Sequence, residues 1–304
     1  MRSSGAAAMG MIAAAIAGAG CGLQGGSGSS GVTVTVTRDF SSRTVATRSY
    51  QNVRGSDSVL RLLQRGFRVQ TSNRKRVVQA IDRLSARPPR ASWFYYVNGI
   101  APALGPASTE LHSGDRIWWD LHPTSASTHA VVGSFPEPFV HGIGGKRFPT
   151  TLECAADVGQ ACRQVTSALE GIGVPVAVQA PGTGSGTDSL AVVVGTWTDL
   201  RGEIAAALLA HGPSASGVYA RFSPSGGRLE LLSPQGTVKR TVTRAGGLVA
   251  AVGQGSSPPA WLVTGTDPAG VKAAADALTA NRLHNRFALA VSAGGDVPLP
   301  VTSR

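Results

Sequence analysis

The stretch that decides the fold runs from residue 92 to 122 and holds two segments, Trp93-Phe94-Tyr95-Tyr96-Val97-Asn98-Gly99 and Gly114-Asp115-Arg116-Ile117-Trp118-Trp119-Asp120-Leu121-His122. Six of the chain's seventeen Phe, Tyr and Trp residues lie in it. Aromatic side chains bury large apolar areas and also hold flat apolar ligands. The stretch therefore indicates the core of a small β domain, a binding surface, or both, and it offers no obvious catalytic group.

The two segments alternate as β-strands do, because successive side chains of a strand point to opposite faces. One face then carries Trp93, Tyr95 and Trp119, which we predict to be core. The other face carries the side chains that we predict to bind a ligand or partner, namely Phe94, Tyr96, Trp118 and His122.

The preceding sequence predicts two strands, at 32–37 and 43–53, and a short helix capped by Ser56-Asp57. The stretch 77–84 fits either a helix or a strand. This order, and the turns Asn98-Gly99 and Gly114-Asp115 between aromatic strands, resemble the C-terminal domain of transcobalamin and intrinsic factor and the bacterial DUF4430 domains grouped with it. The resemblance covers roughly residues 31–122. It implies a β-grasp fold with a strand at 77–81, and cobalamin or a related corrinoid as the first ligand to test.

The N-terminus is typical of an export signal, with Arg2 followed by the uncharged, apolar segment 6–20. That segment is shorter than the roughly 20 residues that span a bilayer. Cys21 follows two small residues, as in a bacterial lipobox, although Gly18 replaces the usual larger aliphatic residue. We expect lipidation of Cys21, with ordinary cleavage after Ala19 as the alternative, and hence a protein outside the cytoplasm that is lipid-anchored or secreted.

Cys154 and Cys162 are the remaining cysteines and favour a disulfide in an exported chain. A continuous helix would hold residues eight apart about 12 Å from each other, whereas a disulfide needs Cα atoms within about 7 Å. The segment must therefore turn, and Asp157-Val158-Gly159 is the expected place. The alternative is two buried thiols. Two thiols without other nearby ligands do not make a zinc site, so no metal is expected.

The net charge of +11 is concentrated between residues 54 and 90, a segment that contains ten basic residues and two acidic ones. Export argues against nucleic acid as the partner. Lipid headgroups, wall polymers or a phosphate on a ligand are the expected anions, and a solvated basic face is the simpler alternative.

We divide the chain into a signal peptide (1–21), a Gly/Ser-rich tether (22–31), the β-grasp domain (32–122), a Pro/Gly-rich connector (123–150) and a second domain (151–304). Three phenylalanines in the connector predict that it packs onto something. Apolar strands alternate with helices in the second domain, which predicts an α/β sandwich. Asp199 and Asp267 are expected helix caps there. The fold class is therefore α+β, and the whole chain resembles actinobacterial DUF4430 lipoproteins.

Several catalytic motifs are missing from the sequence. The run Gly182-Thr-Gly-Ser-Gly186 precedes a strand and lacks Lys, so it is not a phosphate loop. No Gly-x-Ser-x-Gly elbow occurs, and no convergent set of carboxylates is evident. We therefore predict a binding protein without a cofactor rather than an enzyme. A histidine from His112, His122, His129 or His141 is a candidate axial ligand for a corrinoid cobalt. The alternative is an adaptor lipoprotein that docks another envelope component or an anionic polymer.

Overall fold

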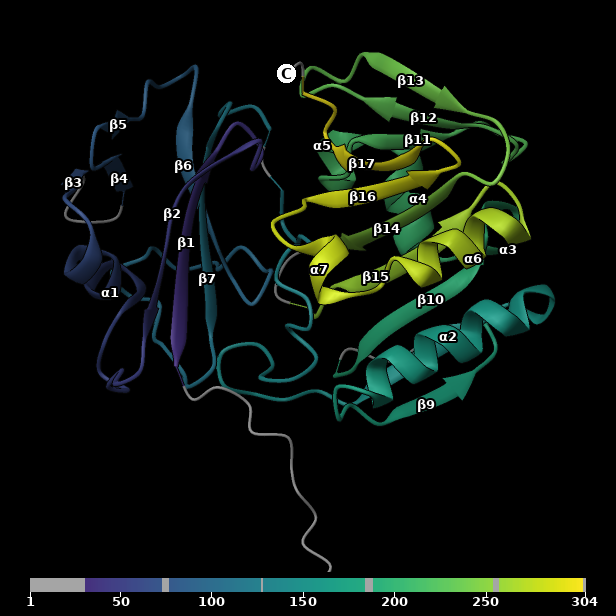
Figure 1. Cartoon of the computed structure of the whole chain (residues 1–304), viewed down its shortest axis with the longest axis horizontal. Coiled ribbons are helices and arrows are strands. Elements are labelled where there is room, and N and C mark those ends of the chain that lie inside the picture. Colours follow the sequence, from purple (N-terminus) through teal and green to yellow (C-terminus); the bar gives the residue numbers. More distant parts are fainter. Residues whose placement is uncertain (1–30, 73–76, 127, 184–187, 254–256, 303–304) are drawn as a thin grey trace, which may run out of the picture.

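The computed structural model describes residues 31–72, 77–126, 128–183, 188–253 and 257–302, so Cys21, the signal and nearly all of the tether lie outside the described residues. The described chain forms two bodies side by side (Figure 1). The N-terminal body (31–122) is built on a four-stranded sheet and the C-terminal body (150–302) on a seven-stranded sheet. The fold is a mixed α+β fold, as predicted. No helix among the described residues is long and apolar enough to cross a membrane.

The four-stranded sheet has the order β2-β1-β7-β6. The strands are β1 Val32–Arg38, β2 Arg43–Tyr50, β6 Ser92–Val97 and β7 Arg116–His122. The central pair, β1 and β7, is parallel, and the outer strands pair with it antiparallel. First and last strands as parallel neighbours are the arrangement of a β-grasp.

One face of this sheet is covered by helix α1 (Val59–Gly66), which buries its leucines against the valines of β1 and against Ile117 and Trp119 of β7. Trp93 and Trp119 are buried there and Tyr95 packs at the margin, as the alternation predicted. The ambiguous stretch is strand β4 (Val77–Ile81). It pairs with β3 (Val69–Ser72) and β5 (Leu84–Ser85) in a separate small sheet.

Helix α1 begins later than predicted. Ser58 caps it, accepting a hydrogen bond from the Arg61 amide at 3.3 Å. Asp57 is instead buried, accepts from the Arg54 amide and lies 3.3 Å from the Arg65 guanidinium. An Asp that pairs with cations in this way is not free to cap, so the Ser56-Asp57 prediction was wrong.

The seven-stranded sheet has the order β17-β16-β14-β15-β10-β8-β9. Pairing is parallel from β15 to β9 and antiparallel from β17 to β15. The strands are β8 Thr150–Cys154, β9 Val176–Gln179, β10 Leu190–Thr196, β14 Gly247–Val252, β15 Ala260–Gly265, β16 Ala288–Ser292 and β17 Gly295–Leu299.

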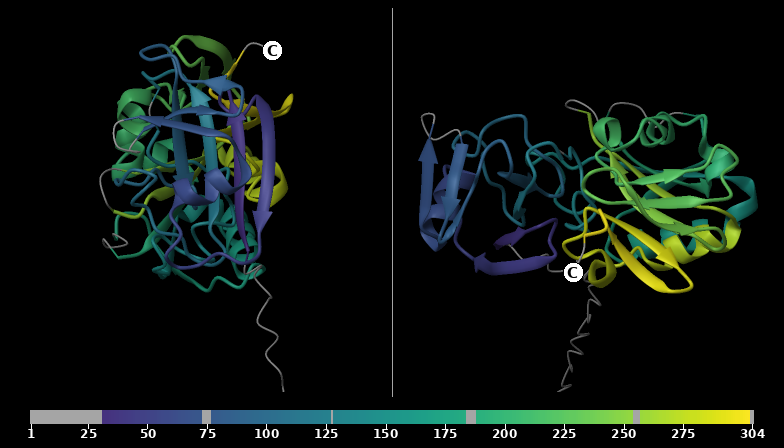
Figure 2. Two further views of the ribbon diagram at one scale, coloured as in Figure 1. Left: turned by 90° about the vertical axis from the view of Figure 1, so that its left-hand side faces the viewer. Right: turned by 90° about the horizontal axis from the view of Figure 1, so that it is seen from above.

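Both faces of this sheet are covered, which explains its continuous apolar strands. Helices α2 (Gly159–Glu170) and α6 (Pro268–Asp276) pack on one face. Helix α4 (Ile204–Ala210) and a small antiparallel sheet pack on the other (Figures 1 and 2). The strands of the small sheet are β11 Ala220–Phe222, β12 Leu229–Leu232 and β13 Val238–Val242.

The two predicted caps had different outcomes. Asp267 caps α6 by accepting from the Gly270 amide at 2.8 Å, as expected. Asp199 is not a cap: it is the third residue of the single turn α3 (Trp197–Leu200), in a capping box with Thr196. The helix that Asp199 was expected to cap, at 200–211, is shorter and begins at Ile204, as α4. The sequence did not predict the edge strand β17. Its Pro298 argues against a strand everywhere except at a sheet edge.

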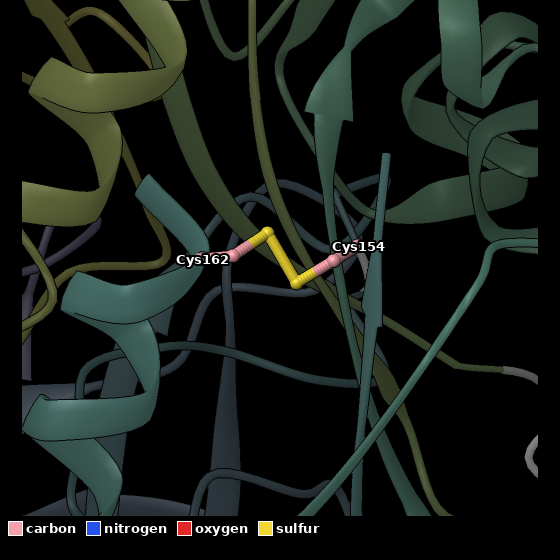
Figure 3. Close-up of a disulfide and its surroundings, with 2 residues drawn as sticks. All are labelled: Cys154 and Cys162. Carbon is pink, nitrogen blue, oxygen red and sulfur yellow. A yellow bond between two sulfur atoms is a disulfide. The ribbon is translucent and has the colours of Figure 1, made fainter. Parts of the chain in front are cut away.

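The predicted disulfide is present (Figure 3). Cys154 ends β8 and Cys162 lies in α2, with their Cα atoms 6.1 Å apart. The short 3-10 helix Ala156–Val158 and the start of α2 at Gly159 reverse the chain between them. The turn therefore lies where the geometric requirement of the disulfide placed it.

The connector packs onto the C-terminal body, as its phenylalanines predicted. Phe135 and Phe139 are buried, and their ring centroids lie 6.0 and 5.0 Å from that of Trp261 in β15. Residues between the two sheets thus contribute to the core beneath α2 and α6.

The second face of the four-stranded sheet lies against the C-terminal body (Figure 1). At the tip of the β1–β2 hairpin, Phe40 is buried among three rings. Its centroid lies 4.6 Å from that of His122, 5.2 Å from that of Phe287 and 5.7 Å from that of Tyr219. The hairpin tip therefore joins the two bodies.

The backbone of this tip is strained. Asp39, Phe40 and Ser41 have φ values of 57°, 55° and 61°, and the left-handed region costs a non-glycine residue about 1–2 kcal/mol. The buried Asp120 carboxylate stabilises the turn by accepting from the amides of Phe40 and Ser41 at 3.1 and 2.9 Å. Phe40 thus reaches the C-terminal body on a turn that Asp120 holds in place.

Replacing Phe40 with Ala should lower the free energy of unfolding by about 3–5 kcal/mol and loosen the contact between the bodies. Phe67→Ala is the matched control, since Phe67 is equally buried but packs only in the core beneath α1. We expect hydrogen–deuterium exchange at 218–220 and 287–291 to rise in Phe40→Ala and not in Phe67→Ala. Equal exchange in both variants would contradict the assignment.

Candidate functional site

The four side chains predicted to bind a ligand share one face of the sheet, but that face is not free. Tyr96, Trp118 and His122 are 0%, 2% and 1% exposed, and Phe94 is half-buried. The ring of Phe287, which precedes β16, lies 4.8 Å from that of Trp118 and 5.4 Å from that of His122. The C-terminal body therefore covers this face, and the binding of a ligand by these four side chains stays a prediction.

His122 is the centre of a buried ring stack. Its centroid lies 4.6 Å from that of Phe40 and 4.2 Å from that of Phe94. Its Nδ1 shares a 2.8 Å hydrogen bond with Asp120, while Nε2 has no hydrogen-bond partner among the described residues. A ligand could reach His122 only after the two bodies part.

The hydrogen bonds of this face converge on the Asp120 carboxylate. The indole Nε1 of Trp118 donates to the Thr37 hydroxyl at 2.7 Å, and that hydroxyl donates to the Asp120 carboxylate at 2.5 Å. With the two backbone amides of the hairpin tip and His122, the Asp120 carboxylate has its acceptor positions filled. This arrangement suits a structural joint, because a buried carboxylate stabilises the fold only when its oxygens are paired in this way.

An open cavity lies at another edge of the same domain, beside the Asn98-Gly99 turn. This loop cavity has a volume of about 490 Å³, within the range of small-ligand sites. Its walls are mostly apolar, and Leu104 is 61% exposed there. The lining residues are Val97, Ile100, Pro102, Ala103, Leu104, Ser108, Thr109, Glu110, His112, Ile143 and Gly144.

Tyr95 fixes one wall of the loop cavity. Its hydroxyl donates to the Leu104 carbonyl at 2.6 Å and lies 2.8 Å from the Thr109 hydroxyl. Burial raises the pKa of Tyr95 to about 12, against a smaller lowering by Thr109. The phenol therefore stays protonated, and able to donate, at any physiological pH.

Asn98 and Asp115 tie together the loops behind the loop cavity. The Asn98 amide nitrogen donates to Asp115 at 2.9 Å and to the Gly142 carbonyl at 2.8 Å. Asp115 also accepts from the His112 amide at 2.8 Å. Burial raises the pKa of Asp115, although the hydrogen bonds from His112 and Asn98 oppose the rise. The two turns that suggested the family thus also position His112.

A second carboxylate lies near this network. Glu137 is buried and accepts from the His141 amide at 2.8 Å, with its other oxygen 2.6 Å from His141 Nδ1. Its charge adds to the rise of the Asp115 pKa. The side chains of His112 and His141 are partly exposed, unlike that of His122. Among the described residues, no group of three or more His, Cys, Asp or Glu side chains is arranged to hold a metal ion.

Burial raises the pKa of each of the four tyrosines: to about 12 in Tyr95 and Tyr219 and well above 10 in Tyr96, while in Tyr50 the nearby Arg48 and Arg65 oppose the rise. A raised phenol pKa stabilises the fold below the unfolded value of about 10, and that stability is lost as the pH rises through the folded value. We expect absorbance at 295 nm to show that Tyr95, Tyr96 and Tyr219 do not ionise at pH 10 in the native protein.

Tyr95→Phe should lower the free energy of unfolding at pH 8 by about 1–2 kcal/mol, since the hydroxyl bonds are lost. It should also reduce the loss of stability between pH 10 and about 12. Urea unfolding at pH 8 measures the first effect, and urea unfolding at pH 10 and at about pH 12 measures the second. An ordinary tyrosine titration in the native protein would contradict the burial of these phenols.

Comparisons with known proteins bear on the N-terminal body. Comparison with curated proteins gives no match. A solved structure from Ruminococcus gnavus ATCC 29149, described as "a putative metal binding protein", is 14% identical, with a TM-score of 0.25, over 31% of this chain and 96% of that chain. At this TM-score the likeness carries no argument. Residues 56–123 match the family described as "Domain of unknown function (DUF4430)", which confirms over this segment the resemblance that the turns and aromatic strands indicated.

Proposed function

We propose that this protein is a cell-surface lipoprotein that binds a ligand through its DUF4430 domain and performs no catalysis. The loop cavity is the observation that carries the proposal. It is open, mostly apolar and large enough for a small ligand or for part of a larger one. The export signal and Cys21 support the location at the cell surface. Because the aromatic face is buried, we place the ligand in the loop cavity.

A corrinoid is the first ligand to test, on the strength of the resemblance to the transcobalamin C-terminal domain. A cobalt ligand has to come from an accessible imidazole. The His112 side chain is 38% exposed and lines the loop cavity, whereas that of His122 is fully buried. Of the four candidate histidines, His112 is therefore the one that we assign as the cobalt ligand. The described residues include no helical barrel like the one that completes the transcobalamin site, so a separate protein would supply the other half.

Titration with hydroxocobalamin tests this proposal, because replacement of the cobalt-bound water by an imidazole changes the visible spectrum. We expect a saturable change with the intact protein and none with His112→Ala. His129→Ala, which removes an exposed histidine outside the loop cavity, should behave as the intact protein does. The corrinoid proposal fails if no saturable change occurs, or if both variants retain it equally.

A second candidate function, docking to an anionic polymer or lipid surface, rests on a different observation. Nine arginines between residues 43 and 90 are described, and all are exposed: Arg43, Arg48, Arg54, Arg61, Arg65, Arg68, Arg83, Arg87 and Arg90. Asp57, one of only two acidic residues in this interval, pairs with Arg61 and Arg65. The excess positive charge is thus available to an anionic surface.

Binding to phosphatidylglycerol vesicles measures this function. Since exposed charges are screened within about 8–10 Å at physiological salt, binding should weaken steeply as salt is added. Replacing Arg83, Arg87 and Arg90 with Gln should weaken it further.

The control replaces three exposed arginines outside this region, Arg147, Arg163 and Arg244, with Gln. The net charge changes equally in both triple variants. Equal weakening in the two would show a nonspecific charge effect and exclude the region 43–90 as the docking surface.

A further inference from the structure

A second cavity lies between the two bodies, next to the strained hairpin tip. This interdomain cavity has a volume of about 620 Å³. The hairpin tip and Pro123 form one side, and the β12–β13 turn, β13 and the end of the chain form the other. Figure 2 shows that end beside the hairpin. The lining residues are Asp39, Phe40, Ser42, Arg43, Pro123, Ser233, Pro234, Gln235, Lys239, Val301 and Thr302.

The charges of the interdomain cavity favour an anion. Arg43, at the start of β2, and Lys239, at the bulge of β13, line it from opposite bodies. Neither has a carboxylate partner within 4.0 Å among the described residues. The one acidic lining residue, Asp39, lies 3.7 Å from the guanidinium of Arg38. Two cations are therefore left to attract the same ligand, and each body contributes one.

The rest of the lining favours an organic ligand. Phe40, Pro123, Pro234 and Val301 provide apolar contact. The side chains of Ser42, Gln235 and Thr302 add polar groups between them. An anion with an apolar part matches this mixture better than a bare inorganic ion, which could not use the apolar walls.

The backbone strain lies in the wall of this cavity. The left-handed residues 39–41 place Phe40 in the wall and lead directly into Arg43. Strained backbone conformations cluster at ligand sites, where the surrounding structure holds them. Here the holding group is the Asp120 carboxylate, which lies behind the wall and takes no part in the cavity itself.

We propose that the interdomain cavity binds a small organic anion, whose carboxylate or phosphate pairs with Arg43 and Lys239 and whose apolar part lies against Phe40 and Val301. The ligand contacts both bodies at once. Because it binds only when they are docked, it stabilises their docked arrangement by mass action. This site is separate from the loop cavity and does not depend on a corrinoid ligand.

The test is isothermal titration calorimetry of the full chain with phenyl phosphate, benzoate and inorganic phosphate. We expect saturable binding of the first two and weaker binding of inorganic phosphate. Arg43→Gln and Lys239→Gln should each weaken binding about tenfold, since each removes a charge-assisted hydrogen bond. The control variants Arg147→Gln and Arg163→Gln, which alter exposed arginines outside the cavity, should bind as the unaltered chain does.

Three outcomes would overturn the proposal. The first is the absence of saturable binding by both organic probes. The second is equal weakening in the site and control variants, which would indicate a general charge effect. The third is equal affinity for inorganic phosphate and phenyl phosphate, which would show that the apolar part of the ligand does not contribute to binding. Arg43 and Lys239 are exposed, so their variants should keep the melting temperature of the unliganded chain, and this is measured alongside.

Discussion

The buried carboxylate of Asp120 is the interaction on which the arrangement of the two bodies depends. It accepts hydrogen bonds from the strained hairpin tip, from Thr37 and from His122. Through these bonds it fixes Phe40, which packs against Phe287 of the C-terminal body. A buried carboxylate without such hydrogen-bond donors would strongly destabilise the fold. The Asp120 network therefore links the strained turn to the ring stack.

This joint changes where a ligand can bind. The aromatic face of the four-stranded sheet is an intramolecular interface in this chain, and its rings pack between the two bodies. Two cavities that a ligand can enter lie beside this covered face. The loop cavity lies beside the turns of β6 and β7, and the interdomain cavity lies beside the tip of the β1–β2 hairpin. The first belongs to the DUF4430 domain and its adjoining loops, whereas the second exists only when both bodies are docked.

Much of the fold could be predicted from local sequence. The alternation of Trp93 to Val97 and of Arg116 to His122 assigned their side chains to the correct faces, and the Cys154–Cys162 spacing predicted the turn at 157–159. Local reasoning failed where a residue had a partner outside its own segment. Asp57 pairs with cations instead of capping α1, and β17 is acceptable as a strand only because it lies at the sheet edge.

The sequence by itself determined the family resemblance, the strand faces, the disulfide and the concentration of charge, because each depends on residues near one another in the chain. Only the tertiary structure showed that the second aromatic face of the sheet is covered as well. The covering side chains include Phe287 and Tyr219, which are far along the chain from β6 and β7. The local sequence of a strand pair indicates that an apolar face will be buried. It does not indicate whether another part of the chain or a ligand covers that face, because this depends on packing between segments that are distant in the sequence.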